Sequence, residues 1–116
     1  MHVGDWRPFG PVPEISVKEL QKKREAGAVQ IVDVRTGPEF RRSHIPDAMH
    51  LPITAFSRHR LDSLELDRDR PVVAICLTAH RSIPAVRKLR ELGYDARQLR
   101  GGMRAWWKSG GTCTQD

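Results

Sequence analysis

The apolar residues of this chain gather in four short runs that alternate with amphipathic segments. Two of the runs, AVQIVDVR at 28–35 and PVVAIC at 71–76, are rich in β-branched residues, which is typical of strands buried on both faces of a parallel sheet. Weaker runs, AMHLP at 48–52 and YDARQL at 94–99, predict two further strands. Pro71 can only begin its strand, because proline cannot donate a hydrogen bond within a sheet.

The segments between these runs carry the spacing of helices. Ser16 followed by Glu19 has the form of a capping box, and the helix that it begins is expected to end at Gly27. A second helix is expected to be capped by Ser82 and to end at Gly93. Its first turn holds a proline, and its inward face consists of Ala85, Val86, Leu89 and Leu92.

Three less regular segments complete the pattern. Residues 36–46 (TGPEFRRSHIP) predict a turn with about one helical turn, and residues 54–66 predict a weakly amphipathic helix. A tight turn at Gly101 and Gly102 precedes a last helix at 103–110. Strands that alternate with helices predict an α/β domain, in which right-handed crossovers cover both sides of a parallel sheet.

Length and composition fit a single domain. The chain has 116 residues, of which 39% are hydrophobic and 29% charged, and no apolar run approaches the roughly 20 residues that cross a bilayer. The N-terminus lacks the basic start and apolar stretch of a secretory signal, so we expect a cytoplasmic protein without a membrane segment. We expect an irregular N-terminal arm at 1–13, a domain at 14–108 and a flexible polar tail at 109–116.

The positive charge is concentrated in one part of the sequence. The net charge is +6, and residues 81–108 hold eight lysines and arginines against only Glu91 and Asp95. This basic sector favours an anionic partner, which could be a small oxyanion, an acidic protein or nucleic acid. Nucleic acid has only the charge in its favour, because no recognition motif accompanies it.

Cys76 lies at a predicted junction between a strand and a helix, a position that favours a reactive thiolate. It ends the predicted strand at 71–76, and the loop CLTAHR leads from it into the next helix. Ligands bind beyond the carboxyl ends of strands in open α/β sheets. Loop amides curled around the sulfur, the helix N-terminus, His80 and Arg81 would all favour the nucleophilic thiolate. A small buried hydrophobic cysteine is the alternative, but it would need neither this loop nor a capped helix.

Asp33 and Arg35 lie two residues apart at the end of a predicted strand, so they share a face near Cys76. We expect them to pair with neighbours such as Glu39 and to hold the loops in place. A contribution of Arg35 to the anion field is the alternative.

No metal or other cofactor is expected. Cys76 and His80 form the only close pair of possible ligands, whereas a structural zinc needs four; His80 is expected at the rim of the site. Cys113 lies in the polar tail, and both cysteines should be free thiols in a reducing compartment. Trp106 and Trp107 are expected to pack the last helix, with one of them able to line a pocket rim.

Three segments in order, DVRTGPEFRRSHIPDAMHLP, CLTAHRS and RKLRELGYDARQLRGGMRAW, resemble the rhodanese family of sulfurtransferases from about residue 14 to residue 108. The resemblance implies a five-stranded parallel sheet with helices on both faces and a Cys76 that cycles between thiolate and persulfide. Ala79 stands where the family often has glycine in the loop, and Ser43 and Asp47 stand where it often has GHIPGA. If the loop needed positive φ at Ala79, the strain would be about 1 kcal/mol or somewhat more.

The length of the loop separates sulfur from phosphorus chemistry. The related phosphatases place five residues between cysteine and arginine, whereas four lie between Cys76 and Arg81. The shorter loop suits a terminal sulfur atom better than a phosphoryl group. We therefore predict a thiosulfate sulfurtransferase of the rhodanese type, in which Cys76 is catalytic and the substrate-binding residues are Leu77, Thr78, Ala79, His80, Arg81 and Ser82.

The expected donor is thiosulfate or a related small anion. The expected acceptor is cyanide in an assay, or a thiol or an acidic protein in the cell. The alternative is a persulfide carrier or sensor module without turnover, which docks an acidic partner through the basic sector at 81–108.

Overall fold

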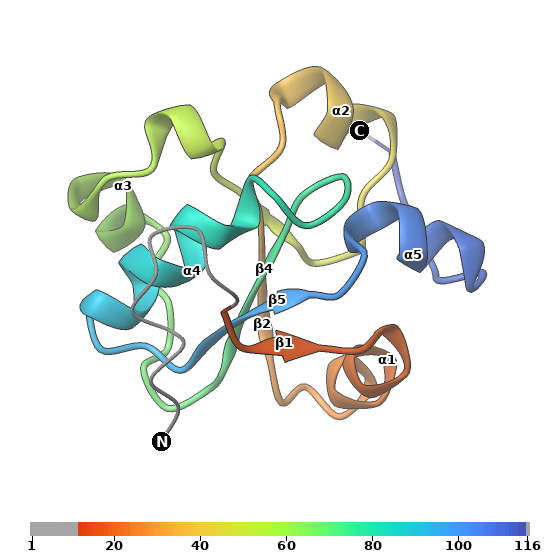
Figure 1. Cartoon of the computed structure of the whole chain (residues 1–116), viewed down its shortest axis with the longest axis horizontal. Helices are drawn as coiled ribbons and strands as arrows, with labels where there is room; N and C mark the ends of the chain where they lie inside the picture. Colours follow the sequence, from red (N-terminus) through yellow and green to blue (C-terminus); the bar gives the residue numbers. More distant parts are fainter. Residues whose placement is uncertain (1–11, 116) are drawn as a thin grey trace.

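The computed structural model describes residues 12–115 and contains one sheet of five parallel strands in the order β1-β5-β4-β2-β3 (Figure 1). The strands are Glu14–Ile15 (β1), Gln30–Asp33 (β2), Met49–His50 (β3), Val72–Ile75 (β4) and Ala96–Leu99 (β5). The central strand, β4, lies between β2 and β5. The chain passes from β2 to β3 at one edge and from β4 to β5 toward the other, so the strand order reverses between β2 and β4. Ligands bind α/β sheets at the carboxyl ends of strands that flank such a reversal.

Helices cover both faces of the sheet, as the rhodanese resemblance implied (Figure 1). They are α1 (Val17–Glu25), α2 (Gly37–Arg42), α3 (Arg58–Ser63), α4 (Ser82–Glu91) and α5 (Gly102–Lys108), with a 3₁₀ turn, η2, at Ile53–Ala55. Alternate residues of a strand point to opposite faces. On the face of α3 and α4, the buried core includes Val72, Ala74, Cys76, Leu61 and Leu89. On the face of α1 and α5, it includes Val73, Ile75, Leu20, Met103 and Trp106.

The four strands predicted from the apolar runs are all present, and each is shorter than its run. The fifth strand, β1, was not visible in the pattern. It has two residues and follows Pro13 directly, and it pairs with β5 so that Glu14 lies opposite Gln98. Two residues are too few to show a period, so the pairing with β5, and not the local sequence, defines this strand.

The predicted helix starts are confirmed at α1 and corrected at α4. The Ser16 hydroxyl accepts a hydrogen bond from the Glu19 N–H at 3.1 Å and caps α1. The prediction that Ser82 caps α4 is wrong: Arg81 is the N-cap and Ser82 is the first helical residue. The Ser82 hydroxyl is buried and forms its bonds inside the domain, so it is not available to the amides of the first turn.

The C-terminal segment lies beside α2 (Figure 1). Thr114 and His44 form an antiparallel bridge with N to O distances of 2.8 and 3.0 Å, and the indole Nε1 of Trp106 donates to the Thr112 carbonyl at 2.9 Å. The flexibility predicted for 109–116 and the domain boundary at 108 stay predictions. Residues 1–11 of the predicted N-terminal arm lie outside the described residues.

No helix in the described part of the chain combines the length and the apolar character that a membrane span requires.

Candidate active site

Cys76 follows β4 directly, and its side chain turns into the core under α4. It is a free thiol with an exposed fraction of 1%. Its Sγ lies 3.5 Å from the Oγ of Ser82, the first residue of α4. The sulfur is therefore enclosed between the end of the central strand and the first turn of the helix, and residues 77–81 form the loop that joins them.

This loop leaves a row of backbone donors unused. Within residues 12–115, no hydrogen bond is formed by the N–H groups of Leu77, Thr78, Ala79, His80 and Arg81. Consecutive free amides at a loop can form a nest for an anion, and the N-terminus of α4 adds a partial positive charge of its own. The loop is thus able to hold negative charge on a group attached to Cys76.

Ala79 carries no backbone strain. Among the described non-glycine residues, positive φ occurs at Asp47 (72°) and Glu65 (53°) and not in the loop. The strain considered for an alanine at this position is therefore absent. Asp47, at a position where the rhodanese family often has glycine, does adopt the left-handed conformation, which aspartate tolerates better than most residues.

The N-terminus of α5 holds the start of the loop in place through two backbone hydrogen bonds. The Met103 N–H donates to the Cys76 carbonyl at 2.8 Å, and the Arg104 N–H donates to the Leu77 carbonyl at 3.0 Å. Gly102 makes this approach possible, because a Cβ at this residue would collide with the carbonyl oxygens of Cys76, Leu77 and Thr78. The sequence predicted a tight turn at Gly101 and Gly102, and the structure adds that Gly102 supports the loop.

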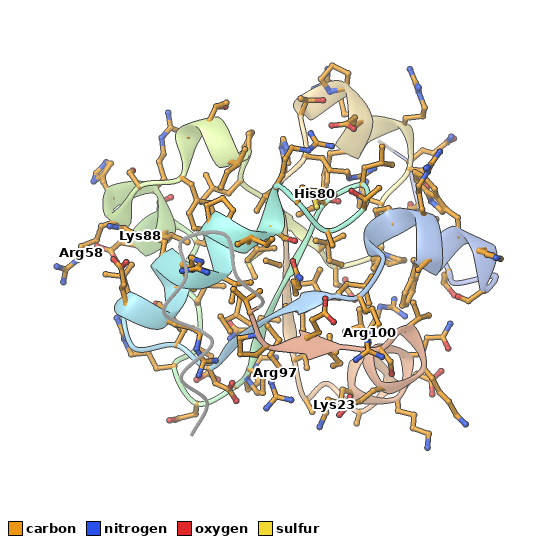
Figure 2. The ribbon with its side chains drawn as sticks, viewed as in Figure 1. Lys23, Arg58, His80, Lys88, Arg97 and Arg100 are labelled. Atoms are coloured by element: carbon orange, nitrogen blue, oxygen red, sulfur yellow. The ribbon has the colours of Figure 1, made fainter. Side chains whose placement is uncertain are left out.

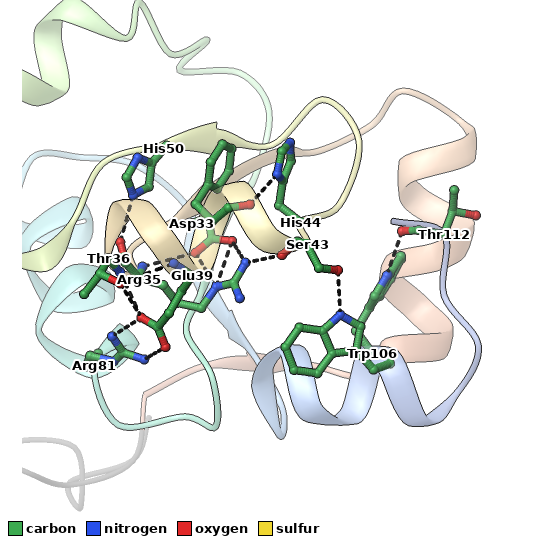
Figure 3. A network of polar contacts seen from close by, with 12 residues as sticks. Asp33, Arg35, Thr36, Glu39, Ser43, His44, His50, Arg81, Trp106 and Thr112 are labelled. Carbon is green, nitrogen blue, oxygen red and sulfur yellow. Dashed lines mark hydrogen bonds and ion pairs between the residues drawn. The ribbon is translucent and has the colours of Figure 1, made fainter. Parts of the chain in front are cut away.

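Arg81, at the end of the loop, is bound by Glu39 of α2 (Figure 3). Its guanidinium donates to Glu39 Oε1 at 2.8 Å and to Oε2 at 3.0 Å. The same carboxylate accepts from Thr36 N–H and closes a capping box at the start of α2. The ion pair therefore ties the end of the loop to α2, and the expected action of Arg81 on the Cys76 thiolate stays a prediction.

The ion pair between Arg81 and Glu39 shifts the pKa values of both side chains. The hydrogen bond from Arg81 lowers the pKa of Glu39 from 4.5 to about 2. The bond to Glu39 raises the pKa of Arg81, with smaller contributions from Cys76 and Asp33. The guanidinium thus stays positively charged within the field of the Cys76 sulfur.

Asp33 and Arg35 pair with each other and not with Glu39, which corrects one detail of the expectation. Arg35 Nη2 and Nε lie 2.7 and 2.9 Å from the Asp33 carboxylate oxygens, and both side chains are 1% exposed. Arg35 Nη2 also donates to the Ser43 carbonyl at 2.7 Å (Figure 3). The pair joins the end of β2 to the segment after α2, as expected of residues that hold the loops.

The remaining predicted site residues lie at different depths. His80 is exposed at the loop (Figure 2), and its Nδ1 lies 3.2 Å from Thr78 Oγ1. Ser82 is 1% exposed and faces Cys76 Sγ. Substrate binding by residues 77–82 stays a prediction.

A cavity of about 300 Å³ opens beside the loop. Its walls come from the segment after β2, from α2 and the residue after it, from the loop and from α5. The lining residues are Arg35, Glu39, Arg42, Ser43, Leu77, Arg104 and Trp107. Trp107 is 41% exposed and therefore lines this rim, whereas Trp106 is buried in the core. The guanidinium groups of Arg42 and Arg104 form no hydrogen bond or ion pair within residues 12–115. The cavity therefore offers two unpaired positive charges.

Glu39→Gln should weaken the fold only where Glu39 is ionised. At pH 7 we expect a loss of about 1 kcal/mol in the free energy of unfolding, a modest value because the Arg81 and Glu39 side chains are 35% and 30% exposed. The pKa of Glu39 is 4.5 unfolded and about 2 folded. The contribution is therefore complete above pH 4.5 and disappears as the pH falls through about 2.

Urea denaturation of wild type and variant between pH 7 and pH 2 would measure this difference. Glu91→Gln is the control, because Glu91 is an exposed carboxylate of α4 without an ion-pair partner in residues 12–115. A Glu39 effect of constant size across this range would contradict the prediction.

Comparison with known proteins assigns most of the described residues to one protein family. The family model of the rhodanese-like domain matches residues 16–109. An HTH-type transcriptional regulator of Mycobacterium tuberculosis is 39% identical over 103 residues, which cover 86% of this chain and 44% of the regulator. The thiosulfate sulfurtransferase GlpE of Shewanella oneidensis is 38% identical over 93 residues, which cover 79% of this chain and 89% of GlpE. The crystal structure of a rhodanese-related protein from Thermoplasma volcanium superposes with a TM-score of 0.77 at 26% identity, covering 90% of this chain and all of the other.

Proposed function

Because this chain belongs to the family of rhodanese-like domains, we propose that it is a sulfurtransferase that carries sulfur on Cys76. The observation that supports this proposal is the row of five unpartnered amides at residues 77–81 beside the sulfur, at the carboxyl end of the central strand. Such donors suit a negatively charged sulfur that has only one attachment to the protein.

The proposed reaction has two halves. The Cys76 thiolate attacks the outer sulfur of thiosulfate; the new S–S bond forms as the S–S bond of thiosulfate breaks, and sulfite leaves with the bonding electron pair. Cys76 then carries a persulfide with negative charge on its terminal sulfur. An acceptor such as cyanide attacks that sulfur, and the Cys76 thiolate is the leaving group. A reaction in two halves predicts ping-pong kinetics.

Residues 77–82 have different parts in this proposal. The amides of Leu77, Thr78, Ala79, His80 and Arg81 would stabilise the terminal sulfur in both halves. The Arg81 side chain is held by Glu39, so its charge would act on the sulfur through the field. Ser82 would act on Sγ, which its hydroxyl already faces.

The cavity beside Leu77 is the proposed entrance for the donor. Arg104→Gln and Arg42→Gln should each raise the KM for thiosulfate about threefold at low ionic strength, because each removes an unpaired positive charge from the rim. The effect should shrink with added salt, since salt screens exposed charges.

Steady-state kinetics of sulfurtransfer would test this expectation. Lys108→Gln is the matched control, because Lys108 is an exposed cation of the same helix, α5, that does not line the cavity. An equal rise in KM for the Lys108 variant would show that only net charge matters.

The proposal includes a location and an acceptor class. A cytoplasmic location would keep the free Cys76 reduced for attack on the donor. A thiol or an acidic protein is the proposed cellular acceptor, since the basic sector at 81–108 favours an anionic partner.

Production of thiocyanate from thiosulfate and cyanide by purified protein tests the function. Many turnovers per molecule are expected. Uptake of one sulfur without turnover would favour the carrier or sensor module that docks an acidic partner. Efficient hydrolysis of an aryl phosphate without any sulfur transfer would contradict the proposal in favour of a phosphatase.

A further inference from the structure

A line of hydrogen bonds leads from Cys76 to the edge of the sheet. Cys76 Sγ lies 3.5 Å from Ser82 Oγ, and the Ser82 hydroxyl donates to Gln98 Oε1 of β5 at 2.6 Å. Gln98 Nε2 donates to Glu14 Oε2 of β1 at 2.9 Å, and Arg100 Nε donates to Glu14 Oε1 at 3.1 Å. Figure 2 shows Arg100 at the β1 edge of the sheet. Ser82 and Gln98 are buried, at 1% and 4% exposed, so the line crosses the interior.

The direction of each bond is fixed by the carboxylate at its outer end. An ionised carboxylate can only accept, so Gln98 must turn Nε2 toward Glu14 and Oε1 toward Ser82. Ser82 has a single hydroxyl proton, and its shortest contact, at 2.6 Å, directs that proton to Gln98 Oε1; the Ala79 carbonyl is farther, at 3.4 Å. The side of Ser82 Oγ that faces Cys76 therefore presents a lone pair, which suits an S–H donor.

Ionisation of Cys76 reverses this requirement. The S–H proton goes to solvent, and the thiolate needs a donor where Ser82 presents a lone pair. The Ser82 hydroxyl can supply that donor only by leaving Gln98 Oε1, which is then buried without a partner. Gln98 and the Cys76 thiolate thus compete for one proton.

We infer that Gln98 is a positioning residue that sets the direction of the Ser82 hydroxyl and thereby opposes the free Cys76 thiolate. Sulfur loading ends the competition, because the negative charge moves to the terminal sulfur and Sγ becomes a neutral, two-bonded atom. The hydroxyl then returns to Gln98. The bond between Ser82 and Gln98 therefore favours the persulfide over the bare thiolate. This inference rests on the proposed role of Cys76 as the sulfur carrier.

Alkylation by iodoacetamide measures the thiolate directly: the thiolate attacks carbon, the C–S bond forms, and iodide leaves. The full chain would be used in the Cys113→Ser background, so that only Cys76 reacts. Gln98→Met keeps the length of the side chain and removes the acceptor. We expect the alkylation rate on the rising limb of the pH profile to increase about fivefold, as expected for one released hydrogen bond, and the midpoint to move to lower pH.

Two further variants test whether Gln98 acts on Cys76 through the Ser82 hydroxyl. In the Ser82→Ala background, adding Gln98→Met should leave the midpoint unchanged, because no hydroxyl remains for which to compete. Glu14→Ala removes the group that fixes the Gln98 amide and should move the midpoint in the same direction as Gln98→Met. It also provides the test if Gln98→Met does not fold.

The control for burial is Gln30→Met. Gln30 is a buried glutamine of β2, but its amide bonds to Asp67 and Arg70 and not toward the sulfur. This variant should lower stability and leave the alkylation profile unchanged. All variants keep the charged or titratable groups on elements around Cys76, which are His80 and Arg81 of the loop, Glu39 of α2, Asp33 of β2, Arg35 just after β2, and Arg104 of α5. Glu14→Ala in addition removes a carboxylate of β1.

The inference is overturned if Gln98→Met has the same effect with and without the Ser82 hydroxyl, or if neither Gln98→Met nor Glu14→Ala moves the midpoint. Either result would leave sulfur uptake by Cys76 untouched. Absence of sulfur uptake with the expected alkylation profiles would instead remove the proposed function alone.

Discussion

The Cys76→Ser variant should lose thiosulfate:cyanide sulfurtransfer by a factor of about a thousand or more, as expected when the attacking nucleophile is removed. A serine hydroxyl is a far weaker nucleophile than a thiolate, and it does not form a persulfide. The fold should persist, because a serine at this position keeps a donor toward Ser82 Oγ, where the Cys76 Sγ now lies 3.5 Å away. We expect the free energy of unfolding to change by about 1 kcal/mol.

Cys113→Ser is the matched control for this experiment. Cys113 is the second free cysteine of the chain and is exposed in the C-terminal segment, so its loss should leave activity and stability unchanged. Turnover would be measured by thiocyanate production, and stability by urea denaturation. Activity retained in the Cys76 variant, or lost in the Cys113 variant, would contradict the proposed mechanism.

The Gly102→Ala variant should lose both stability and activity. Its new Cβ would meet the carbonyl oxygens of Cys76, Leu77 and Thr78 at distances that real Cβ atoms do not adopt, so the loop or α5 must move. The two bonds that α5 donates to the loop would be lost or distorted with that movement. We expect a loss of about 3 kcal/mol or more in the free energy of unfolding and a sulfurtransfer rate reduced at least about tenfold, because the loop amides lose their geometry.

Gly27→Ala is the control for Gly102→Ala, because it separates the effect of a steric collision from the effect of a left-handed backbone conformation. Gly27 also has positive φ, at 67° against 59° for Gly102, but a Cβ there would meet nothing within 4 Å. This variant should be destabilised by about 1 kcal/mol through the left-handed conformation alone, with full activity. Equal losses in the two variants would show that Gly102 has no special contact with the loop.

The sequence predicted those features that a local pattern can carry. The apolar runs located four strands, and the strand that Cys76 directly follows is the central one. The order of helices and strands predicted the α/β layers, and the spaced motifs indicated the rhodanese-like family, which the comparisons confirm. Each of these features depends on neighbouring residues or on their order along the chain.

The contacts that tie the loop to the domain were not predicted, because they join distant segments. Glu39 lies 42 residues from Arg81. Its spacing from Thr36 has the T-x-x-E form of a capping box, so the sequence did hold a sign that α2 begins there. No local pattern in the sequence predicted that the same carboxylate would bind Arg81 of the loop.

Gln98 is the clearest case of a residue whose role could not be predicted from the sequence. It lies in a strand, and neither β-propensity nor spacing distinguishes it from any other polar strand residue. Its importance appears only when β1, β5 and α4 are assembled, because its two partners, Glu14 and Ser82, lie 84 and 16 residues away. The expectation that Ser82 caps α4 failed for the same reason, since its hydroxyl bonds across the core.

The central claim is that Cys76 accepts a sulfur atom, and the mass of the protein tests it most directly. Purified protein would be treated with thiosulfate, freed of excess reagent and examined intact by mass spectrometry, followed by peptide mapping. We predict a gain of one sulfur atom on Cys76, its removal by cyanide, and no gain in Cys76→Ser. A wild-type protein whose Cys76 gains no sulfur from thiosulfate or from polysulfide would contradict the account.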